Sequence, residues 1–470
     1  MFIGREREIK LLKDITDNPK AKVAIIYGRR RIGKSSLIQK TLENKQALYF
    51  EGIENQSKKN QINNFITQFK RQTGINKWHE PINTWSEAFL LLENVLKNNP
   101  ACIVLDEFQW MANYRVDIVS ELKMVWDLYL SKIQGVSLIL CGSIASFMKG
   151  KVIKSSAFYG RCDQVIHLQE FDLKQTCIFL KDKGSHEIID AQMYLGGIPK
   201  YLELIKEEPS VQIGIDKLSF SPNGYFYDEF DRIFVSHFGK TSDYYKIVTL
   251  LSKYPYGLVR KQIIEKTKTA TGGQITLILE NLQSAGMIAS NYPVDKKDGS
   301  KLKKYYLIDP YLRFYFAFIK DNKKKISEGF LEGYFSKVKQ SNKFNTFKGR
   351  AFEYLCIAHA KQIADILGFG AIEYNFGPYY RSSEDFENGV QIDMLYDRAD
   401  NILTLIEAKY TSGIISTNII PQIEKKINHI KKKFPKKTVQ PVLIVEGEVS
   451  DKLKNALYFY KIIKASSLLN

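Results

Sequence analysis

The first 170 residues alternate between short apolar runs and longer amphipathic stretches. Uninterrupted apolar runs are typical of strands that are buried on both faces of a parallel sheet, and the amphipathic stretches between them are typical of the helices that cover it. The pattern predicts an α/β domain built on a parallel sheet. The runs are VAIIY at 23–27, CIVL at 102–105, SLILC at 137–141 and QVIH at 164–167.

Residues 241–309 follow a different pattern, with three helical stretches before two short β-like runs that flank an Asp-Gly dipeptide. Asp-Gly between such runs is a strong hairpin signal, and three helices followed by a hairpin is the order of a winged helix-turn-helix. The hairpin lysines would contact phosphates if this module binds DNA, but the third helix carries Glu280 and almost no Lys or Arg. The pattern favours a role for this module as a relay or in binding a partner over recognition of specific DNA bases. The hairpin lysines are Lys296, Lys297, Lys301, Lys303 and Lys304.

A pair of apolar runs, VQIDMLYD at 390–397 and NILTLIEAKY at 401–410, predicts a hairpin in the C-terminal part. If its turn is symmetric about Asp400, Asp397 faces Leu403 and Asp393 faces Glu407. Directly opposed side chains on one face of a sheet have Cβ atoms about 5 Å apart. The register therefore brings two carboxylates together among apolar neighbours.

Lys409 lies two residues after Glu407, so the two side chains share one face of the strand. Two close carboxylates repel each other, and a divalent cation removes that cost. Carboxylate oxygens suit Mg²⁺, and Lys409 would hold an attacking water or offset charge on a phosphate. The alternative is an exposed Glu/Lys pair on an edge strand, worth less than about 1 kcal/mol.

Composition adds a preference for an anionic partner. The chain has 470 residues, enough for two to four domains, and a formal charge of +18 with a pI near 9.3. This charge favours nucleic acid first and an acidic membrane surface second, and the alternative is a Lys-rich proteome in which many proteins are basic. Five scattered cysteines without a CxxC pair predict neither a zinc site nor disulfides. With no signal peptide and no apolar run long enough to span a bilayer, the expected location is the cytoplasm.

The run at 23–27 leads directly into Gly28-x-x-x-x-Gly33-Lys34-Ser35, and a helical pattern follows. This is a phosphate-binding loop in its required context of strand, loop and helix. Its backbone N–H groups would curl around phosphates at a helix N-terminus. Lys34 would reach the β and γ phosphates, and the Ser35 hydroxyl, followed by Ser36, would ligate Mg²⁺. ATP and Mg²⁺ are therefore the expected cofactors.

The later strands of this domain end in polar residues that suit the same chemistry. Asp106 and Glu107 follow the second run, and we expect Asp106 to hold a Mg²⁺-bound water and Glu107 to activate the water that attacks the γ-phosphate. Ser143, after the third run, could sense the γ-phosphate. Arg161 precedes the fourth run and is a candidate arginine finger, although a surface arginine explains it equally well.

These stretches together resemble the archaeal-type ATPases of the AAA+/STAND class. The resemblance rests on FIGREREIKLL, YGRRRIGKSSLI, IVLDEFQW, LILCGS, FYGR and GGIPKYL, and covers most of residues 1–320. It implies a helical lid after the sheet, with Gly197-Ile198-Pro199 as the G-x-P element near the base and ribose. It also implies that the winged helix belongs to the nucleotide switch.

Asp393, Glu407 and Lys409 have the form D-x(n)-E-x-K and resemble the PD-(D/E)xK nuclease superfamily. The resemblance covers about residues 345–450 and includes a helix before the hairpin, a helix after it and a further strand. It implies a restriction-endonuclease-like α/β domain, with Glu353 as the helical acid and Gln422 as a polar accessory residue. The sequence departs from the pattern at Gln391-Ile392, where Pro often precedes the Asp.

The chain is thus expected to be an α/β multidomain protein. One hypothesis is an ATP-regulated, metal-dependent endonuclease, for which DNA is favoured as the substrate and RNA stays open. The other is an ATP-dependent switch that binds nucleic acid, or a protein partner through the winged helix, with an inactive nuclease-like domain. The oligomeric state stays open, as does whether the basic, aromatic-rich connector touches nucleic acid or is a solvated linker. The predicted domains are an ATPase core at 1–170, a lid at 171–238, a winged helix at 239–310, a connector at 311–348 and the nuclease-like domain at 349–470.

Overall fold

The computed structural model divides the chain into two compact units. The first consists of Met1–Glu170 with Glu280–Ala285, and the second of Phe171–Leu279 with Gly286–Asn470. Three of the hairpin lysines, Lys296, Lys297 and Lys301, lie outside the described residues. The residues that the structure describes are 2–76, 81–155, 158, 160–238, 242–269, 272–292, 294, 302–381 and 390–470.

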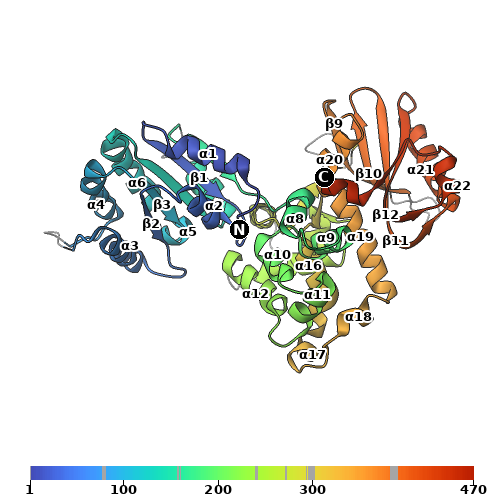
Figure 1. Cartoon of the computed structure of the whole chain (residues 1–470), viewed down its shortest axis with the longest axis horizontal. Coiled ribbons are helices and arrows are strands. Elements are labelled where there is room, and N and C mark those ends of the chain that lie inside the picture. The colour runs from blue at the N-terminus through green and yellow to red at the C-terminus, as the bar shows by residue number, and fades with distance from the viewer. Residues whose placement is uncertain are drawn as a thin grey trace. The chain divides into compact units, whose positions relative to one another are not determined.

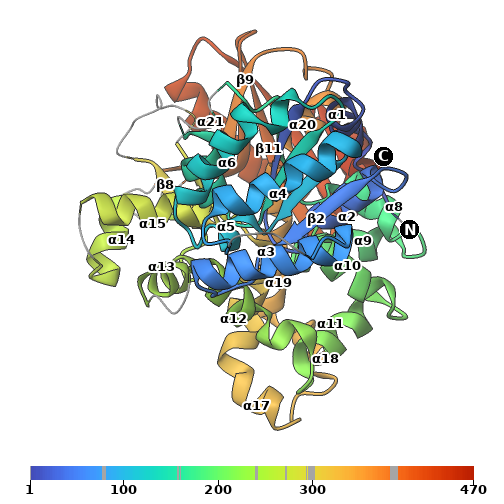
Figure 2. The same cartoon turned by 90° about the vertical axis from the view of Figure 1, so that its left-hand side faces the viewer.

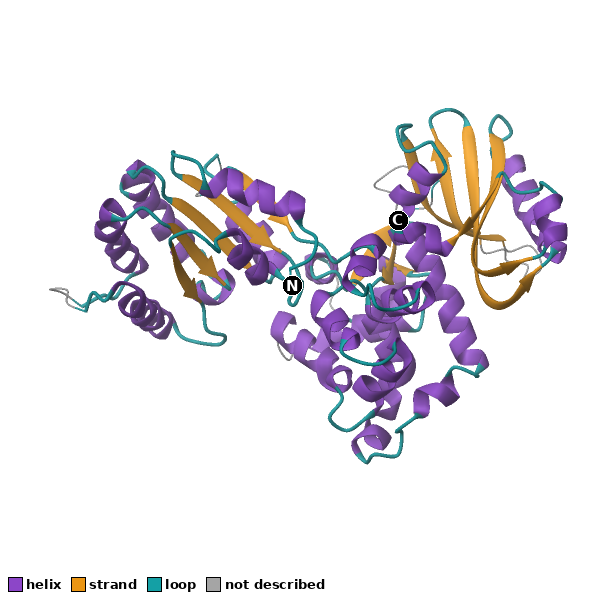
Figure 3. Ribbon diagram, in the orientation of Figure 1, coloured by secondary structure: helices purple, strands orange, loops and turns teal. Residues whose placement is uncertain are grey.

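Five parallel strands form the sheet of the first unit, in the order β2-β3-β4-β1-β5. Figure 3 shows the strands of the protein in orange and its helices in purple. The four apolar runs lie in four of these strands, so the predicted α/β fold with a parallel sheet is confirmed. The fifth strand, β2, is the edge strand that pairs with β3. The strands are β1 (Lys22–Tyr27), β2 (Ala47–Glu51), β3 (Cys102–Asp106), β4 (Ser137–Gly142) and β5 (Gln164–His167).

Helices cover both faces of this sheet (Figures 1 and 2). Val23 and Ile25 of β1 point into a core that they share with α3, α4 and α6, whereas Ala24 and Ile26 point into a second core with α1 and α2. The alternation of a β-strand therefore explains why the runs are apolar at every position. The helices are α1 (Glu6–Thr16), α2 (Lys34–Thr41), α3 (Lys58–Thr73), α4 (Trp85–Asn98), α5 (Phe108–Met111), α6 (Asp117–Leu128) and α7 (Ala145–Phe147).

The second unit begins with five helices, and its connector helices pack with them through aromatic side chains. The ring of Tyr194 on α9 lies 5.8 Å from that of Phe314 and 5.9 Å from that of Phe344, measured between centroids. The predicted connector is therefore part of a packed core rather than a solvated linker. These helices are α8 (Leu173–Phe179), α9 (Ser185–Leu195), α10 (Pro199–Lys206), α11 (Val211–Phe220), α12 (Tyr225–Phe238), α16 (Pro310–Phe314), α17 (Lys323–Ser327) and α18 (Tyr334–Val338).

Between these two sets of helices, the chain forms the three helices and the antiparallel strand pair that the sequence predicts. β7 and β8 pair through Ile288–Leu307 and Asn291–Lys304, and a two-residue strand, β6, adds to β8. Lys304 is half-buried in β8, and this burial lowers the pKa of its ammonium group. The elements are α13 (Ser242–Ser252), β6 (Leu258–Val259), α14 (Arg260–Thr267), α15 (Gly273–Ser284), β7 (Ile288–Asn291) and β8 (Lys304–Leu307).

The C-terminal part of the second unit is a mixed five-stranded sheet in the order β13-β12-β11-β10-β9. β9, β10 and β11 are antiparallel, whereas β11, β12 and β13 are parallel. The predicted order of helix, hairpin, helix and strand is present as α19, β10–β11, α21 and β12, although the expected boundary at 349 falls inside α19. The elements are α19 (Asn342–Ala358), α20 (Ala360–Ile366), β9 (Tyr374–Arg381), β10 (Val390–Arg398), β11 (Ile402–Ile415), α21 (Ile420–Lys433), β12 (Thr438–Val449), α22 (Asp451–Asn455) and β13 (Lys461–Lys464).

Candidate functional site

The phosphate-binding loop joins the end of β1 to the start of α2. Gly33 is the N-cap of α2 and has a φ of 85°, a left-handed conformation that favours glycine. A Cβ on Gly28 would collide with the carbonyl oxygen of Leu168 and the side chain of Ile32. Both glycines are thus needed for the loop to lead into a helix whose first N–H groups face outward, which is the geometry of an anion site.

Lys34 lies over this loop, and its side chain is buried. Its Nζ donates hydrogen bonds to the carbonyl oxygens of Gly28 and Arg29, each at 3.0 Å. A buried ammonium group that is held only by neutral carbonyls retains its capacity to attract phosphate oxygens. The role of Lys34 toward the β and γ phosphates stays a prediction. Ser36, which follows in the same turn of α2, is exposed.

The Ser35 hydroxyl and the Asp106 carboxylate meet beside the loop. Ser35 Oγ donates to Asp106 Oδ2 at 2.7 Å, and the hydroxyl of Tyr49 donates to the same oxygen. Burial, together with the nearby carboxylates of Asp106 and Glu107, raises the pKa of Glu51. A site where carboxylates crowd next to a hydroxyl suits Mg²⁺, so the donor set fits the expected cofactor. Tyr49 is a member of this site that sequence reasoning missed.

Glu107 and Ser143 come together at the carboxyl ends of neighbouring strands. Ser143 Oγ donates to Glu107 Oε2 at 2.8 Å, and Gln109 Nε2 donates to Ser143 Oγ at 3.1 Å and also to Glu107. Gln109 Oε1 in turn accepts from the Ser143 backbone N–H at 3.2 Å. Gln109 therefore holds Glu107 and Ser143 in place through hydrogen bonds. Sequence reasoning missed it, although it follows Glu107 by only two positions.

The structure shows other contacts for the two remaining ATP-site candidates or their neighbours. The Arg161 guanidinium pairs with Asp127 on α6, with Nε 2.8 Å from Oδ1. Pro199 is the first residue of α10 in the second unit, just after Gly197, whose carbonyl oxygen accepts from the Phe171 N–H at 2.8 Å. The arginine-finger role and the base-contact role both stay predictions.

The C-terminal hairpin has the predicted register. Asp397 pairs with Leu403 and Met394 pairs with Ile406, so Asp393 and Glu407 are the next residues on the two strands. Asp393 Oδ2 accepts a hydrogen bond from the backbone N–H of Ala408 at 2.8 Å. Both carboxylates are buried, with 7% of Asp393 and 2% of Glu407 exposed. The exposed edge-strand alternative is therefore wrong.

Two lysines neutralise Glu407. Lys409 Nζ lies 2.7 Å from its Oε1, and Lys426 Nζ lies 2.5 Å from its Oε2. Lys426 comes from α21 and was missed, whereas the predicted Gln422 is exposed one turn earlier on the same helix. The spacing of four residues places the two on one face of α21. A search for cations at helical spacing from Gln422 would have found Lys426.

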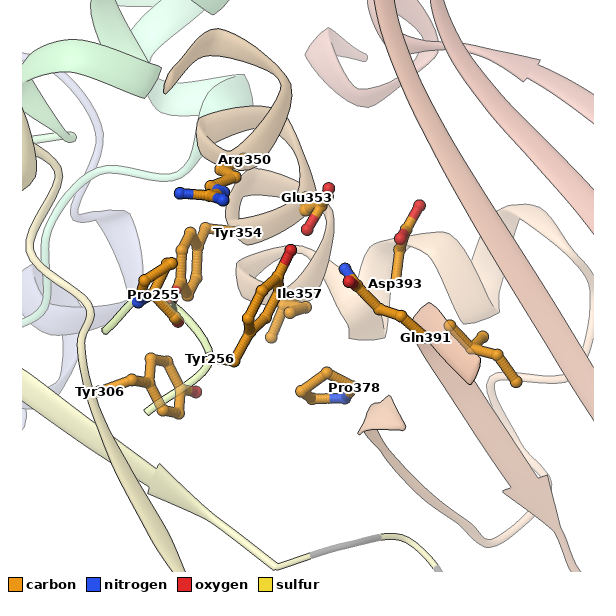
Figure 4. Close-up of a pocket in the computed structure, with 11 residues that line it drawn as sticks. Pro255, Tyr256, Tyr306, Arg350, Glu353, Tyr354, Ile357, Pro378, Gln391 and Asp393 are labelled. Carbon is orange, nitrogen blue, oxygen red and sulfur yellow. Dashed lines mark hydrogen bonds between the residues drawn. The ribbon is translucent and has the colours of Figure 1, made fainter. Parts of the chain in front are cut away.

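Glu353 on α19 and Asp393 on β10 lie beside each other at a small cavity with about 20 Å³ of free volume, enough for a water-sized group (Figure 4). Burial and the nearby charge of Asp393 raise the pKa of Glu353 to about 8. Burial and Glu407 raise the pKa of Asp393 to about 6. Burial opposes ionisation of Lys409, but the carboxylates of Glu407, Asp393 and Glu353 raise its pKa overall.

Glu353, Asp393, Glu407 and Lys409 form one group of side chains, the acidic cluster. Two properties of the acidic cluster suit a divalent cation. Asp393 and Glu353 have raised pKa values because burial and neighbouring carboxylates disfavour their negative charges, and a cation would offset both effects. The oxygen donors suit Mg²⁺ or Mn²⁺. Among the described residues, however, no group of three or more His, Cys, Asp or Glu side chains is placed so that it could hold a metal ion by itself. Water or a ligand would have to complete the coordination.

The N-terminal part of the chain is similar to known ATPase domains. Residues 2–205, less than half of the chain, match a family described as "ATPase domain predominantly from Archaea", which agrees with the phosphate-binding loop described above. The match continues past the first unit through α8, α9 and α10. In the described part of the chain, no helix is long and apolar enough to cross a bilayer.

Two curated relatives come from the archaeon Methanocaldococcus jannaschii. The chain is 28% identical to the uncharacterized protein MJECL04 of Methanocaldococcus jannaschii over 356 residues. This stretch covers 75% of this chain and 76% of that protein. The chain is 48% identical over 46 residues to the uncharacterized ATP-binding protein MJ0423 of the same organism, which is 10% of this chain and 78% of that protein. The walker-type ATPase PABY2304 of Pyrococcus abyssi has a similar structure, with 18% identity, 67% of this chain and 96% of that chain covered and a TM-score of 0.48. The ORC2 protein of Aeropyrum pernix, in complexes with ADPNP and ADP, also has a similar structure. It is 15% identical to this chain, the similarity covers 72% of this chain and 96% of that chain, and the TM-score is 0.41.

We expect Lys34→Ala to lower ATP hydrolysis by at least about 100-fold, because the loop loses the charge that faces the phosphates. Steady-state ATPase assays with Mg²⁺ would measure this. Lys40→Ala is the matched control, since Lys40 lies on the same helix but is exposed and pairs with Glu43. Hydrolysis in Lys34→Ala at the parent rate would refute the assigned role.

We expect Glu353→Gln to stabilise the metal-free protein at high pH but not at low pH. A carboxyl with a raised pKa binds more protons in the folded than in the unfolded state, so the parent loses stability as pH rises from about 4.5 to 8. Glutamine cannot ionise and avoids this loss. The variant should gain roughly 2 kcal/mol over the parent between pH 5 and pH 9, about half of what the full shift would give, because the side chain retains some solvent contact.

Thermal unfolding in EDTA at both pH values would measure the difference between variant and parent. Glu373→Gln makes the same chemical change at an exposed position and should show no such trend. A constant difference between Glu353→Gln and the parent at pH 5 and pH 9 would contradict the unfavourable burial of this carboxyl.

Proposed function

We propose that the chain is an ATP-regulated, metal-dependent nuclease that acts on DNA. The observation that carries this proposal is the convergence of Asp393, Glu407 and Lys409 from two paired strands with Glu353 from α19. The net charge of +18 supports a polyanionic substrate.

In this proposal Asp393 and Glu407 hold the cation and Glu353 lies in reach of its waters. Bound Mg²⁺ or Mn²⁺ would supply a polarised water and charge for the phosphate oxygens. Lys409 would leave Glu407 and orient the attacking water or offset charge on the phosphate. Lys426 would stay with Glu407 and keep its carboxylate in place.

ATP regulation is supported by a contact between the ATPase domain and the strand that carries Lys409. The hydroxyl of Tyr410, the next residue, donates to Asp190 Oδ1 on α9 at 2.7 Å. On the same helix, His186 Nδ1 lies 3.1 Å from Glu446 Oε1 of β12, and this hydrogen bond raises the pKa of His186. Since α9 lies within the ATPase family match, movement of this helix would reach Lys409 directly.

A second candidate function is an ATP-dependent switch that binds nucleic acid or a protein without cutting it. The double pairing of Glu407 with Lys409 and Lys426 favours this alternative, because it neutralises the carboxylate without a metal. Under this alternative the acidic cluster is a structural ion-pair network. Variants of the cluster distinguish the two functions.

The cleavage test uses plasmid and linear DNA, with RNA in parallel, in Mg²⁺ or Mn²⁺ and with or without ATP. The nuclease proposal predicts metal-dependent cleavage that falls at least about 100-fold in Glu407→Gln and Lys409→Ala. Glu448→Gln, at an exposed position of β12, should cleave like the parent. Cleavage that survives Glu407→Gln, or none in any condition, would favour the switch.

The coupling test uses Tyr410→Phe, which removes the hydrogen bond to Asp190 but keeps the aromatic ring. We expect cleavage by this variant to depend less on ATP than cleavage by the parent, with ATP hydrolysis unchanged. Tyr460→Phe is the control at an exposed tyrosine. An ATP response of Tyr410→Phe equal to that of the parent would show that this contact does not couple the two sites.

A further inference from the structure

A second cavity, of about 450 Å³, lies in the second unit next to the carboxylate cluster. Its walls come from α13 and the loop after it, from β8, from α16 with the turn that follows it, and from the first three turns of α19. Cavities of about 300–1,000 Å³ are typical of small-molecule sites. Neither the ATP site nor the cleavage chemistry uses this cavity.

The charged side chains that the structure describes in the wall of this cavity are all positive. Arg313, Lys343 and Arg350 line it, and no Asp or Glu is among the described residues of its wall. The first turn of α19, which begins at Asn342, also faces it and adds the positive end of a 17-residue helix. A ligand that carries a negative charge would meet favourable interactions at this wall.

The rest of the wall is mostly aromatic and apolar, with Ser252, Asn342 and Thr346 as its polar members. Aromatic rings position the cations. The Arg313 guanidinium lies 4.1 Å from the ring centroid of Tyr354, and Lys343 Nζ lies 5.3 Å from that of Phe318. Lys343 also donates to the carbonyl oxygen of Ala317 at 2.6 Å. Phe316, Phe347 and Tyr354 supply ring surface to the cavity itself. Such surfaces bind planar rings by stacking.

A ligand that matches both halves of the wall must combine a planar aromatic body with an anionic group. Inorganic phosphate would leave the aromatic wall uncovered, and an apolar molecule would make no charge interaction with the positively charged part of the wall. We propose that this cavity binds a nucleoside monophosphate, with its phosphate towards Lys343, Arg313 and Arg350 and its base against the aromatic wall.

The cavity shares a wall with the small cavity at Glu353 and Asp393. Pro255, Arg350 and Tyr354 line both, and the Tyr354 hydroxyl donates to the carbonyl oxygen of Pro255 (Figure 4). The bound nucleotide would therefore contact residues that border the acidic cluster. It could come from free nucleotide or from one residue of a DNA strand, and binding of either kind is independent of whether the acidic cluster cleaves DNA.

The test is equilibrium dialysis of the full chain carrying Lys34→Ala, which weakens binding at the phosphate loop. The probes are radiolabelled ribo- and deoxynucleoside 5′-monophosphates and a short 5′-phosphorylated single-stranded DNA. Thr346→Trp fills the cavity from its exposed rim, and Lys343→Glu reverses one charge of the wall. The matched control is Asn345→Trp, an exposed neighbour on α19 that does not line the cavity.

We expect the Lys34→Ala chain to bind a nucleotide probe, both alone and with Asn345→Trp added. Adding Thr346→Trp or Lys343→Glu to the Lys34→Ala chain should weaken this binding by at least about tenfold. Binding of the free monophosphates identifies a free nucleotide as the ligand, and binding of the DNA strand alone identifies a strand nucleotide. The proposal is overturned if no probe binds or if Thr346→Trp binds as well as Asn345→Trp. If Glu407→Gln loses DNA cleavage but still binds the nucleotide, the nucleotide cavity and the cleavage site are distinct sites.

Discussion

Two buried carboxylates on neighbouring strands, Asp393 and Glu407, must be compensated for the C-terminal sheet to form. Removing two like charges from water is costly unless opposite charge or hydrogen bonds accompany them. The protein supplies Lys409 and Lys426 to Glu407 and a backbone N–H to Asp393. Glu353 adds a third carboxyl, and burial together with the nearby charge of Asp393 raises its pKa. A divalent cation would offset the negative charge of these carboxylates.

The same constraint explains how the two halves of the second unit can communicate. β11 carries Glu407 and Lys409 at its buried centre and Tyr410 where it meets α9. Any shift of α9 that breaks the Tyr410–Asp190 hydrogen bond acts within one residue of Lys409. Because α9 belongs to the ATPase match, it is the element through which the proposed control of cleavage by ATP would act on β11.

Local patterns predicted the first-unit sheet, the phosphate loop and the hairpin register, because each depends on neighbouring residues. The apolar runs, the Gly28–Ser35 spacing and the symmetry about Asp400 carry this information directly. Tyr49, Gln109 and Lys426 were missed because they reach their sites from other elements or from positions outside the predicted patterns. The packed role of the connector was also not predictable, since its aromatic residues acquire partners such as Tyr194 only in the folded chain.

Mn²⁺ binding to the nucleotide-free protein, followed by electron paramagnetic resonance, tests most directly whether the buried carboxylate pair is a cation site. Ser35→Ala alters the other expected metal site and serves as the matched variant. The account predicts that Asp393→Asn loses a class of Mn²⁺ sites that both the parent and Ser35→Ala retain. Equal Mn²⁺ binding by Asp393→Asn and the parent would contradict it and leave the cluster as an ion-pair network.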